Sequence, residues 1–146
     1  MRDFPGRLHH DVPSWVPESS CFHIRVRYER ENPTPLTHPE LGVKLLTSVH
    51  VYTERGRWWP YLFLLMPDHW HALLYFPAYE SMSAVVGDWK RFHCLRHRVV
   101  WQENYFDHRL RRTESIEEKA AYIRNNPVVK GLCERPEDWP WVVSAA

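Results

Sequence analysis

Two short segments of the chain hold side chains whose types and spacing could support chemistry. The first, MPDHWHALLYF, places His69 and His71 at alternate positions. The second, YIRNNPVVKGL, opens with Tyr122 and carries Asn126 four positions later. A pair of imidazoles can hold a divalent metal ion, and an activated tyrosine hydroxyl can act as a covalent nucleophile. Together the two segments predict metal-assisted nucleophilic chemistry.

The histidine pair lies in a segment with the pattern of a β-strand. Alternate side chains of a strand project to the same face, about 6–7 Å apart, so His69 and His71 can share one ion. The chain has 10 histidines, so one pair at this spacing is expected by chance. A rival pair, His93 and His97, lies one helical turn apart and could also hold a metal. The apolar strand and Pro-Asp turn that precede His69, and the apolar residues after His71, favour the first pair.

Tyr122 and Asn126 occur where a helix is expected to end. Residues four apart share a helix face, so the two side chains point the same way. Pro127 disfavours helical geometry in the residue before it, which predicts that the helix ends at Asn126 with its amide oxygen free to turn toward a metal. The alternatives are a packing role for the tyrosine and a helix-ending role for the asparagine.

The hydrophobic pattern predicts the elements that position these residues. Residues 1–20 are rich in proline and polar residues and form an irregular lead-in; residues 21–146 form a single domain. The expected strands are residues 21–29, 58–66, 69–76 and a fourth within 99–110. The expected helices are residues 37–51 (starting at Thr37 or Pro39), 81–98 and 115–126.

The order strand, helix, strand, strand, helix, strand predicts an α+β protein with a ferredoxin-like or RRM-like split βαβ fold. Four antiparallel strands would form the sheet, with the histidine pair on a central strand. An additional C-terminal helix would carry Tyr122. Two helices would cover one face of the sheet and leave the other open to a ligand, unless the added helix crosses it.

Composition excludes several classes of protein. At 146 residues with 25% charged residues, the chain is long enough for a hydrophobic core and is too rich in aromatics for a disordered protein. Its longest apolar run, residues 61–66, is too short to span a bilayer. The N-terminus lacks the apolar block of a signal peptide, which predicts a cytoplasmic protein. The 3 cysteines form no CxxC pair and are expected to be reduced thiols.

The basic residues are concentrated in two places although the net charge is only +1. A neutral total does not favour a nucleic-acid binder, but a local basic surface can survive it. Three aromatic side chains nearby, Trp89, Phe92 and Tyr105, could stack on unpaired bases. The alternative is that these are solvated helix faces and core rings. The candidate backbone-binding residues are Lys90, Arg91, Arg96, Arg98, Arg109, Arg111 and Arg112.

Four blocks of the sequence resemble one known family. FHIRVR, MPDHWHALLYF, WQENYFDHRLR and YIRNNPVVKGL occur in the order seen in REP-associated tyrosine transposases and cover most of residues 21–140. That family is part of the histidine-hydrophobic-histidine (HUH) superfamily of single-tyrosine transposases. The resemblance implies that His69 and His71 are metal ligands, with Asn126 as the third, and that Tyr122 is the nucleophile. It further implies a Mg²⁺ or Mn²⁺ ion.

The resemblance implies a metal-dependent single-strand DNA endonuclease and strand transferase. Its substrate would be hairpin-forming DNA such as REP-type palindromes, and its product a 5′-phosphotyrosine linkage. Members of the superfamily act as monomers or as homodimers. Two other functions are compatible with the same residues: a non-catalytic nucleic-acid-binding module on this fold, and a metal-dependent hydrolase that uses water without a covalent intermediate.

Overall fold

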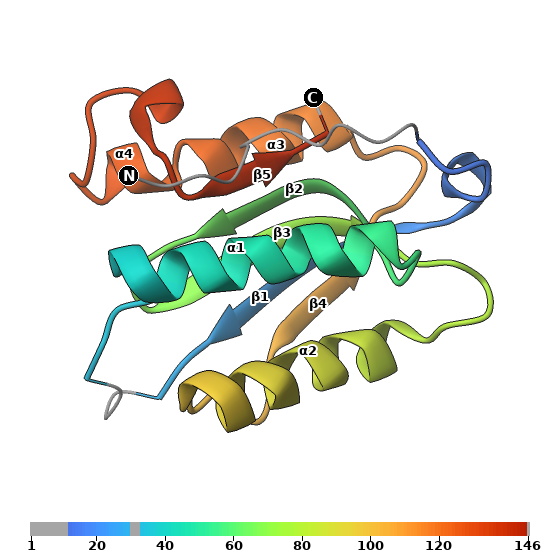
Figure 1. Ribbon diagram of the computed structural model, residues 1–146. Helices are drawn as coiled ribbons and strands as arrows, with labels where there is room; N and C mark the ends of the chain where they lie inside the picture. Colours follow the sequence, from blue (N-terminus) through green and yellow to red (C-terminus); the bar gives the residue numbers. More distant parts are fainter. Residues whose placement is uncertain (1–11, 30–32, 146) are drawn as a thin grey trace.

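A computed structural model describes residues 12–29 and 33–145 of the chain. Five antiparallel strands form one sheet in the order β4-β1-β3-β2-β5 (Figure 1). The strands are β1 Cys21–Arg27, β2 Trp59–Leu65, β3 His69–Tyr75, β4 Phe106–Arg109 and β5 Val142–Ser144. The α-helices are α1 Pro39–Glu54, α2 Met82–His97, α3 Ile116–Arg124 and α4 Asn126–Val129, and Val16–Glu18 and Pro136–Asp138 form 3-10 turns.

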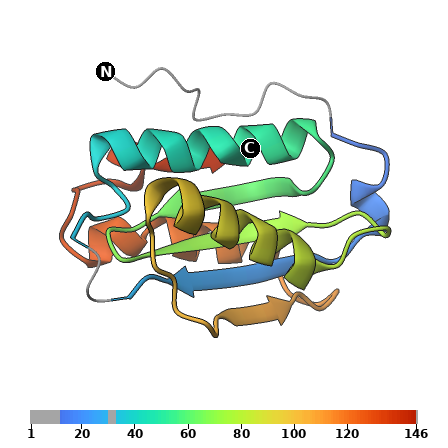
Figure 2. The ribbon, with the colours of Figure 1, turned by 60° about the horizontal axis from the view of Figure 1, so that its bottom comes forward.

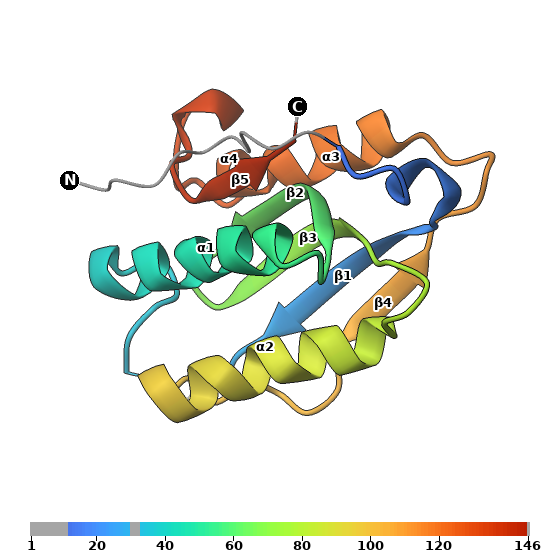
Figure 3. The ribbon, with the colours of Figure 1, turned by 45° about the vertical axis from the view of Figure 1, so that its right-hand side comes forward.

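The predicted α+β split βαβ fold is confirmed, with one correction to the sheet. The histidine segment forms the central strand β3, as expected. The sheet has a fifth strand, β5, which pairs antiparallel with β2 at the edge (Figure 3). This strand is only 3 residues long. Such a segment is too short to show the alternation that identifies a strand, so its pairing with β2 could not be read from its sequence.

Several element boundaries differ from the predicted ones. Helix α1 continues past Val51 to Glu54, and the strand expected within residues 99–110 is limited to Phe106–Arg109. Helix α3 ends at Arg124, two residues before the expected end. Pro127 does not lead the chain out of helical geometry, because it lies in the first turn of α4, where its missing N–H costs no hydrogen bond. Asn126 therefore begins a short helix.

The remaining sequence predictions concern segments outside the sheet. Of the expected irregular lead-in, residues 1–11 lie outside the described residues, and the rest contains the turn Val16–Glu18. All three cysteines are free. Within residues 12–29 and 33–145, no helix has the length and apolar character needed to cross a membrane.

Helices α1 and α2 cover one face of the sheet (Figure 2). An aromatic core lies beneath them. Trp58, Trp70 and Trp89 are completely buried. Trp89 of α2 lies 5.4 Å from Trp70 and 5.5 Å from Phe63, measured between ring centroids. This tightly packed layer accounts for a large part of the hydrophobic stabilisation and makes the central strands a rigid support.

Helix α3 packs on the opposite face, so that face is only partly open. Its buried residues Ala120 and Ile123 contact a second apolar cluster that includes Leu62, Leu64 and Leu73. Because side chains alternate along a strand, Leu73 shares its face with His71 and His69. The added helix therefore covers the end of the sheet next to the histidine pair.

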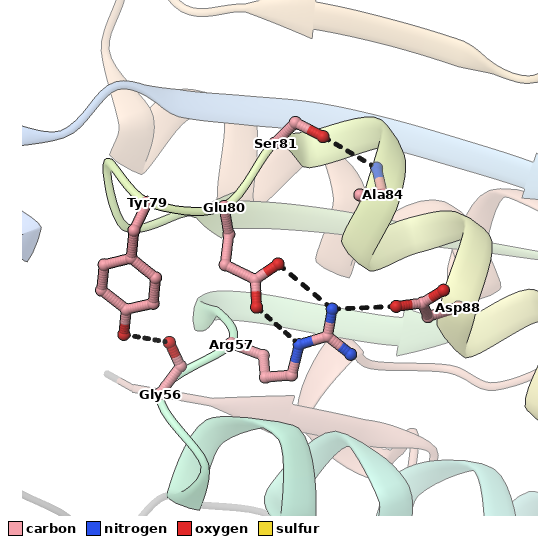
Figure 4. Close-up of polar contacts among 7 residues, drawn as sticks. All are labelled: Gly56, Arg57, Tyr79, Glu80, Ser81, Ala84 and Asp88. Carbon is pink, nitrogen blue, oxygen red and sulfur yellow. Dashed lines mark hydrogen bonds and ion pairs between the residues drawn. The ribbon is translucent and has the colours of Figure 1, made fainter.

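A cluster of ion pairs links two loops near the C-terminal end of β3. Arg57, just before β2, lies 2.9 Å from Oε1 of Glu80 and 3.0 Å from Oδ2 of Asp88 (Figure 4). Arg57 donates a second bond of 3.2 Å to Oε2 of Glu80. Hydrogen bonding to Glu80, although opposed by burial, raises the pKa of Arg57 further above its ordinary value. The cluster joins the α1–β2 turn to the segment that leads into α2.

Candidate active site

His69 and His71 lie at the start of β3 and are almost completely buried. Their side chains share the face of the sheet on which α3 packs, and their exposed fractions are 5% and 4%. The two rings meet edge to face, with centroids 4.8 Å apart. This arrangement agrees with the alternation expected for a strand and brings the two imidazoles within reach of a common ligand.

The carboxylate of Asp68 holds His69 from one side. Oδ1 of Asp68 lies 2.7 Å from Nδ1 of His69. A carboxylate can only accept, so the proton of His69 is on Nδ1 and the lone pair is on Nε2. Oδ2 of Asp68 also lies 3.5 Å from the Arg27 guanidinium. Burial raises the pKa of Asp68, but the bond to His69 and the nearby charges outweigh it, so the pKa is lower than usual.

Both ring nitrogens of His71 have partners from other elements. Nδ1 lies 3.3 Å from Nε2 of His23 on β1. Nε2 lies 2.9 Å from the amide nitrogen of Asn126, the first residue of α4. The sheet and the C-terminal helices thus meet at one side chain.

Burial keeps this group of imidazoles uncharged near neutral pH. It lowers the pKa of His71 to about 3, with further contributions from His69, His23 and Arg25. It also lowers the pKa of His23 to about 4 and, only partly opposed by Asp68, that of His69. Neutral imidazoles carry the free lone pair that a metal ion requires.

Tyr122 lies on α3 between two hollows at the edge of this site. Its exposed fraction is 70%. One hollow, of about 620 Å³, has both Tyr122 and Asn126 in its wall. The other, of about 610 Å³, has both Tyr122 and His23 in its wall. The tyrosine is therefore accessible to a large substrate and borders residues that contact His71.

The residues present can hold a metal ion only as an incomplete ligand set. No group of three or more His, Cys, Asp or Glu side chains within the described part of the chain is arranged around a common ion position. The donors are the two uncharged imidazoles and the amide of Asn126. Two imidazoles and an amide oxygen can bind a divalent metal ion, and such a set leaves positions open for further oxygen ligands.

The rival pair lies in the helical layer behind the sheet. His93 is completely buried on α2, and its Nε2 lies 2.7 Å from Oγ of Ser48. The rings of His93 and His97 are stacked, with centroids 5.2 Å apart. One nitrogen of His93 thus has a structural partner.

The predicted DNA-binding residues are not all near the histidine pair. Lys90, Arg91 and Arg96 lie on α2 and Arg98 is the C-cap residue after it, so these four belong to the helix layer on the opposite face. Lys90 donates a 3.0 Å bond to the carbonyl of Gln102. The guanidinium of Arg109 lies over the ring of Phe22 on that same face. Arg111 and Arg112 border a hollow at the start of α3. Of the three predicted stacking rings, Trp89 is buried, Tyr105 is partly buried and Phe92 is exposed.

Four residues that the sequence did not single out border the site. Arg25 and Arg27 are the direct cross-strand neighbours of His71 and His69, respectively, and thus share their face. His23 shares that face two residues earlier, and Asp68 is adjacent to His69. The alternation of FHIRVR was a usable signal that His23, Arg25 and Arg27 share a face, but it did not show which face.

The chain is similar in sequence to two curated proteins over about half of its length. No family model matches the chain. The REP-associated tyrosine transposase of Escherichia coli K12 is 25% identical over 83 residues, which cover 53% of this chain and 49% of that protein. A relative with the same family name from Haemophilus influenzae is 24% identical over 94 residues, covering 53% of each chain. The chain thus spans about half the length of the curated relatives it matches.

A solved structure extends the match to most of the fold. It shows a REP-associated tyrosine transposase bound to a REP hairpin, and superposes with a TM-score of 0.71 at 20% identity. The match covers 84% of this chain and 75% of that one. The resemblance to REP-associated tyrosine transposases is confirmed. The likeness of the structures extends over both the sheet and the flanking helices, not the histidine segment alone.

Proposed function

We propose that the chain is a metal-dependent single-strand DNA endonuclease and strand transferase that forms a covalent link through Tyr122. One observation carries the proposal: two buried, uncharged histidines lie side by side on β3, and one of them, His71, bonds to Asn126 in the helical segment that bears the exposed Tyr122. The two hollows beside Tyr122 have Asn126 and His23, the two residues that bond to His71, in their walls. The kinship with REP-associated tyrosine transposases supports the same chemistry.

His69 and His71 would hold a Mg²⁺ or Mn²⁺ ion, and the side chain of Asn126 would complete the set through its amide oxygen. Such an ion withdraws charge from the oxygens of a scissile phosphate. The amide nitrogen of Asn126 faces His71 in the structure, so binding through oxygen requires the amide to turn over. Asp68 fixes the ring of His69 with Nε2 available.

Tyr122 would attack the scissile phosphorus of single-stranded DNA in line with the departing group. A bond forms between the tyrosine oxygen and the phosphorus while the bond from the phosphorus to the 3′ oxygen breaks. The phenol loses its proton to solvent, and the 3′ oxygen gains one to become a free hydroxyl. Attack by a second 3′ hydroxyl on the phosphotyrosine reverses the step, so the same site both cleaves and joins strands.

We propose that the substrate is hairpin-forming DNA of the REP type, since a structural relative was solved with a REP hairpin bound. Arg25 and Arg27 would contact its backbone, because they adjoin the histidines. Within the described residues, the Arg25 side chain lies 5.2 Å from the centroid of the Phe106 ring and is not held by a hydrogen bond. Arg111 and Arg112, near the start of α3, are further candidates on the same side as Tyr122.

The test uses labelled single-stranded hairpin DNA, Mn²⁺ and two matched variants. Tyr122→Phe should abolish the labelled protein band on a denaturing gel, while Tyr79→Phe should leave it unchanged. Tyr79 is an equally exposed tyrosine, at 76%, in a distant loop. Equal cleavage by both variants with no linked band would favour a metal-activated water. Hairpin binding with no Mn²⁺-dependent cleavage by the wild type would favour a non-catalytic binding module.

A further inference from the structure

Each histidine of the proposed metal site has its Nδ1 engaged by a different kind of partner. His69 donates from Nδ1 to the carboxylate of Asp68. Nδ1 of His71 instead faces the imidazole of His23 on the neighbouring strand, at 3.3 Å. Metal-binding histidines commonly donate their second N–H to a nearby acceptor, which fixes the tautomer and the ring orientation. The residue that serves His71 in this way is thus a histidine.

The direction of the bond between the two histidines follows from Asn126. Its amide nitrogen is only a donor, so Nε2 of His71 accepts at 2.9 Å and carries the lone pair. The proton of the neutral ring must then be on Nδ1. Since Nδ1 of His71 is the donor, Nε2 of His23 is the acceptor. Both histidines of the pair therefore carry their lone pair on Nε2, and that of His71 becomes available to a metal once the Asn126 amide turns away from it.

His23 is held firmly enough to fix the ring of His71. It lies on β1, between the central strand and β4, and its ring meets that of Phe106 edge to face at 5.3 Å. His23 also lies in the wall of the hollow that Tyr122 borders.

A neutral acceptor also suits a polyanionic substrate. Asp68 already contributes one negative charge, which is paired with Arg27. A second carboxylate in place of His23 would repel a DNA phosphate approaching the histidines, whereas an imidazole fixes the tautomer without adding charge.

We propose that His23 is a positioning residue that sets the tautomer of His71, so that Nε2 of His71 is the metal-binding atom. This inference rests on the proposed function insofar as it assumes a metal at His69 and His71. His23 itself does not bind the ion or the reacting phosphate.

The first arm of the test reads the tautomer in the metal-free protein, by long-range ¹H–¹⁵N correlation spectra of the histidine rings near neutral pH. We expect His71 to be protonated at Nδ1 in the wild type. His23→Gln keeps an acceptor near the position of Nε2 and should preserve this state, whereas His23→Leu should lose it. A wild-type His71 protonated at Nε2, or a tautomer that His23→Leu leaves unchanged, overturns the proposal.

The second arm measures Mn²⁺ affinity with the same variants. Loss of an outer partner typically weakens metal binding about 10–100-fold, so His23→Leu should show a weakening of that size and His23→Gln should restore most of the affinity. His108→Leu is the matched control. His108 lies on β4 directly opposite His23 of β1, but its ring bonds to Glu114. It should leave the affinity unchanged. Equal affinities in the Leu and Gln variants contradict a positioning role.

Two further outcomes separate this inference from the proposed function. If His23 were itself a ligand, the spin-echo spectrum of bound Mn²⁺ would lose an imidazole nitrogen in His23→Gln, which overturns the positioning role but not the metal site. A wild type that binds no Mn²⁺ more tightly than a His69→Ala variant overturns the proposed metal site, and the purpose of His23 with it.

Discussion

The two ends of β3 carry polar clusters of opposite character. At one end Arg57 is bound by two carboxylates, so every charge in the cluster meets an opposite charge. At the other end three histidines and Asn126 contact one another, and Asp68 is the only acid that bonds to them within the described residues. The first cluster is complete without a ligand. Burial disfavours charge on the imidazoles of the second cluster by lowering their pKa values, and this cluster adjoins hollows that a ligand can enter.

This difference distinguishes a polar cluster with a structural role from the one for which we propose a function. Arg57 has a structural role, because it links two chain segments through charge-assisted hydrogen bonds. The histidines instead leave lone pairs at a partly covered face. The comparison predicts that the two clusters can be broken independently: one should affect stability alone and the other activity alone.

The largest expected effect is on the chemistry. Replacing His69 and His71 together by Gln should reduce the yield of Mn²⁺-dependent DNA–protein adduct by at least about 100-fold, since a metal site without its imidazoles loses its affinity. The free energy of unfolding should change by less than about 1 kcal/mol, because glutamine preserves most of the volume. Adduct yield on denaturing gels and urea unfolding measure the two quantities. A large loss of stability with unchanged adduct yield would show that His69 and His71 have a structural role and do not bind the metal.

The next largest effect is on the pH dependence of stability. It comes from His93, a buried and uncharged histidine outside the proposed metal site. Burial and, to a smaller extent, the charge of His97 lower the pKa of His93 from 6.5 to about 3. The unfolded chain binds this proton more readily, so stability is complete above pH 6.5 and falls as the pH drops toward 3. His93 alone should account for roughly 2–3 kcal/mol between pH 6.5 and 4.5.

The variant His93→Gln checks this pH dependence by urea unfolding across that range. Its amide can still bond to Ser48, and its stability should decline less steeply with falling pH than that of the wild type. An unchanged slope would show that His93 is not the group responsible.

Breaking the ion pairs of Arg57 should have a smaller effect, and on stability alone. Arg57→Ala leaves Glu80, whose side chain is 22% exposed, without its partner. Because both side chains are partly solvated, we expect a loss of about 2 kcal/mol in the free energy of unfolding, with Mn²⁺ affinity unchanged. Arg55→Ala, at an exposed neighbouring arginine, is the control and should lose less than about 0.5 kcal/mol. A change in Mn²⁺ affinity in Arg57→Ala would mean that the two ends of β3 are coupled.

The smallest effect concerns which face of the sheet binds DNA. Replacing Arg25 and Arg27 by Gln should weaken hairpin binding about tenfold and lower the slope of log affinity against log salt by about 1.4, the value for two phosphate contacts on a single strand. Replacing Arg91 and Arg96 on α2 should have little effect if DNA lies on the histidine face. The opposite result, from anisotropy titrations at several salt concentrations, would place DNA on the helical layer.

The sequence predicted the elements well wherever a regular hydrophobic period was long enough to see. Strand β3 and helix α2 were recognised almost to the residue, because alternation and helical spacing continue over several turns or pairs. Strand β5 was missed, since its 3 residues are defined by their pairing with β2. Helix α4 was missed because Pro127 can either end a helix or begin one.

The site shows the same limit at the level of side chains. His69 and His71 could be placed on one face from their spacing. Spacing also drew attention to Tyr122 and Asn126, and the family resemblance supplied the roles proposed for all four residues. The contact between His23 and His71 depends on the register of β1 against β3, which a single sequence does not reveal. The separation of the α2 basic residues from the histidines likewise depends on which face of the sheet that helix covers.

The central claim is that Tyr122 becomes covalently attached to DNA, and peptide mapping tests it most directly. After reaction with hairpin DNA and nuclease digestion, trypsin should release residues 120–124, which contain Tyr122 as their one tyrosine. We predict that mass spectrometry finds a nucleotide phosphate on this peptide in the presence of Mn²⁺ and not after chelation. A nucleotide on any other tyrosine, or cleaved DNA with this peptide unmodified, would contradict the account.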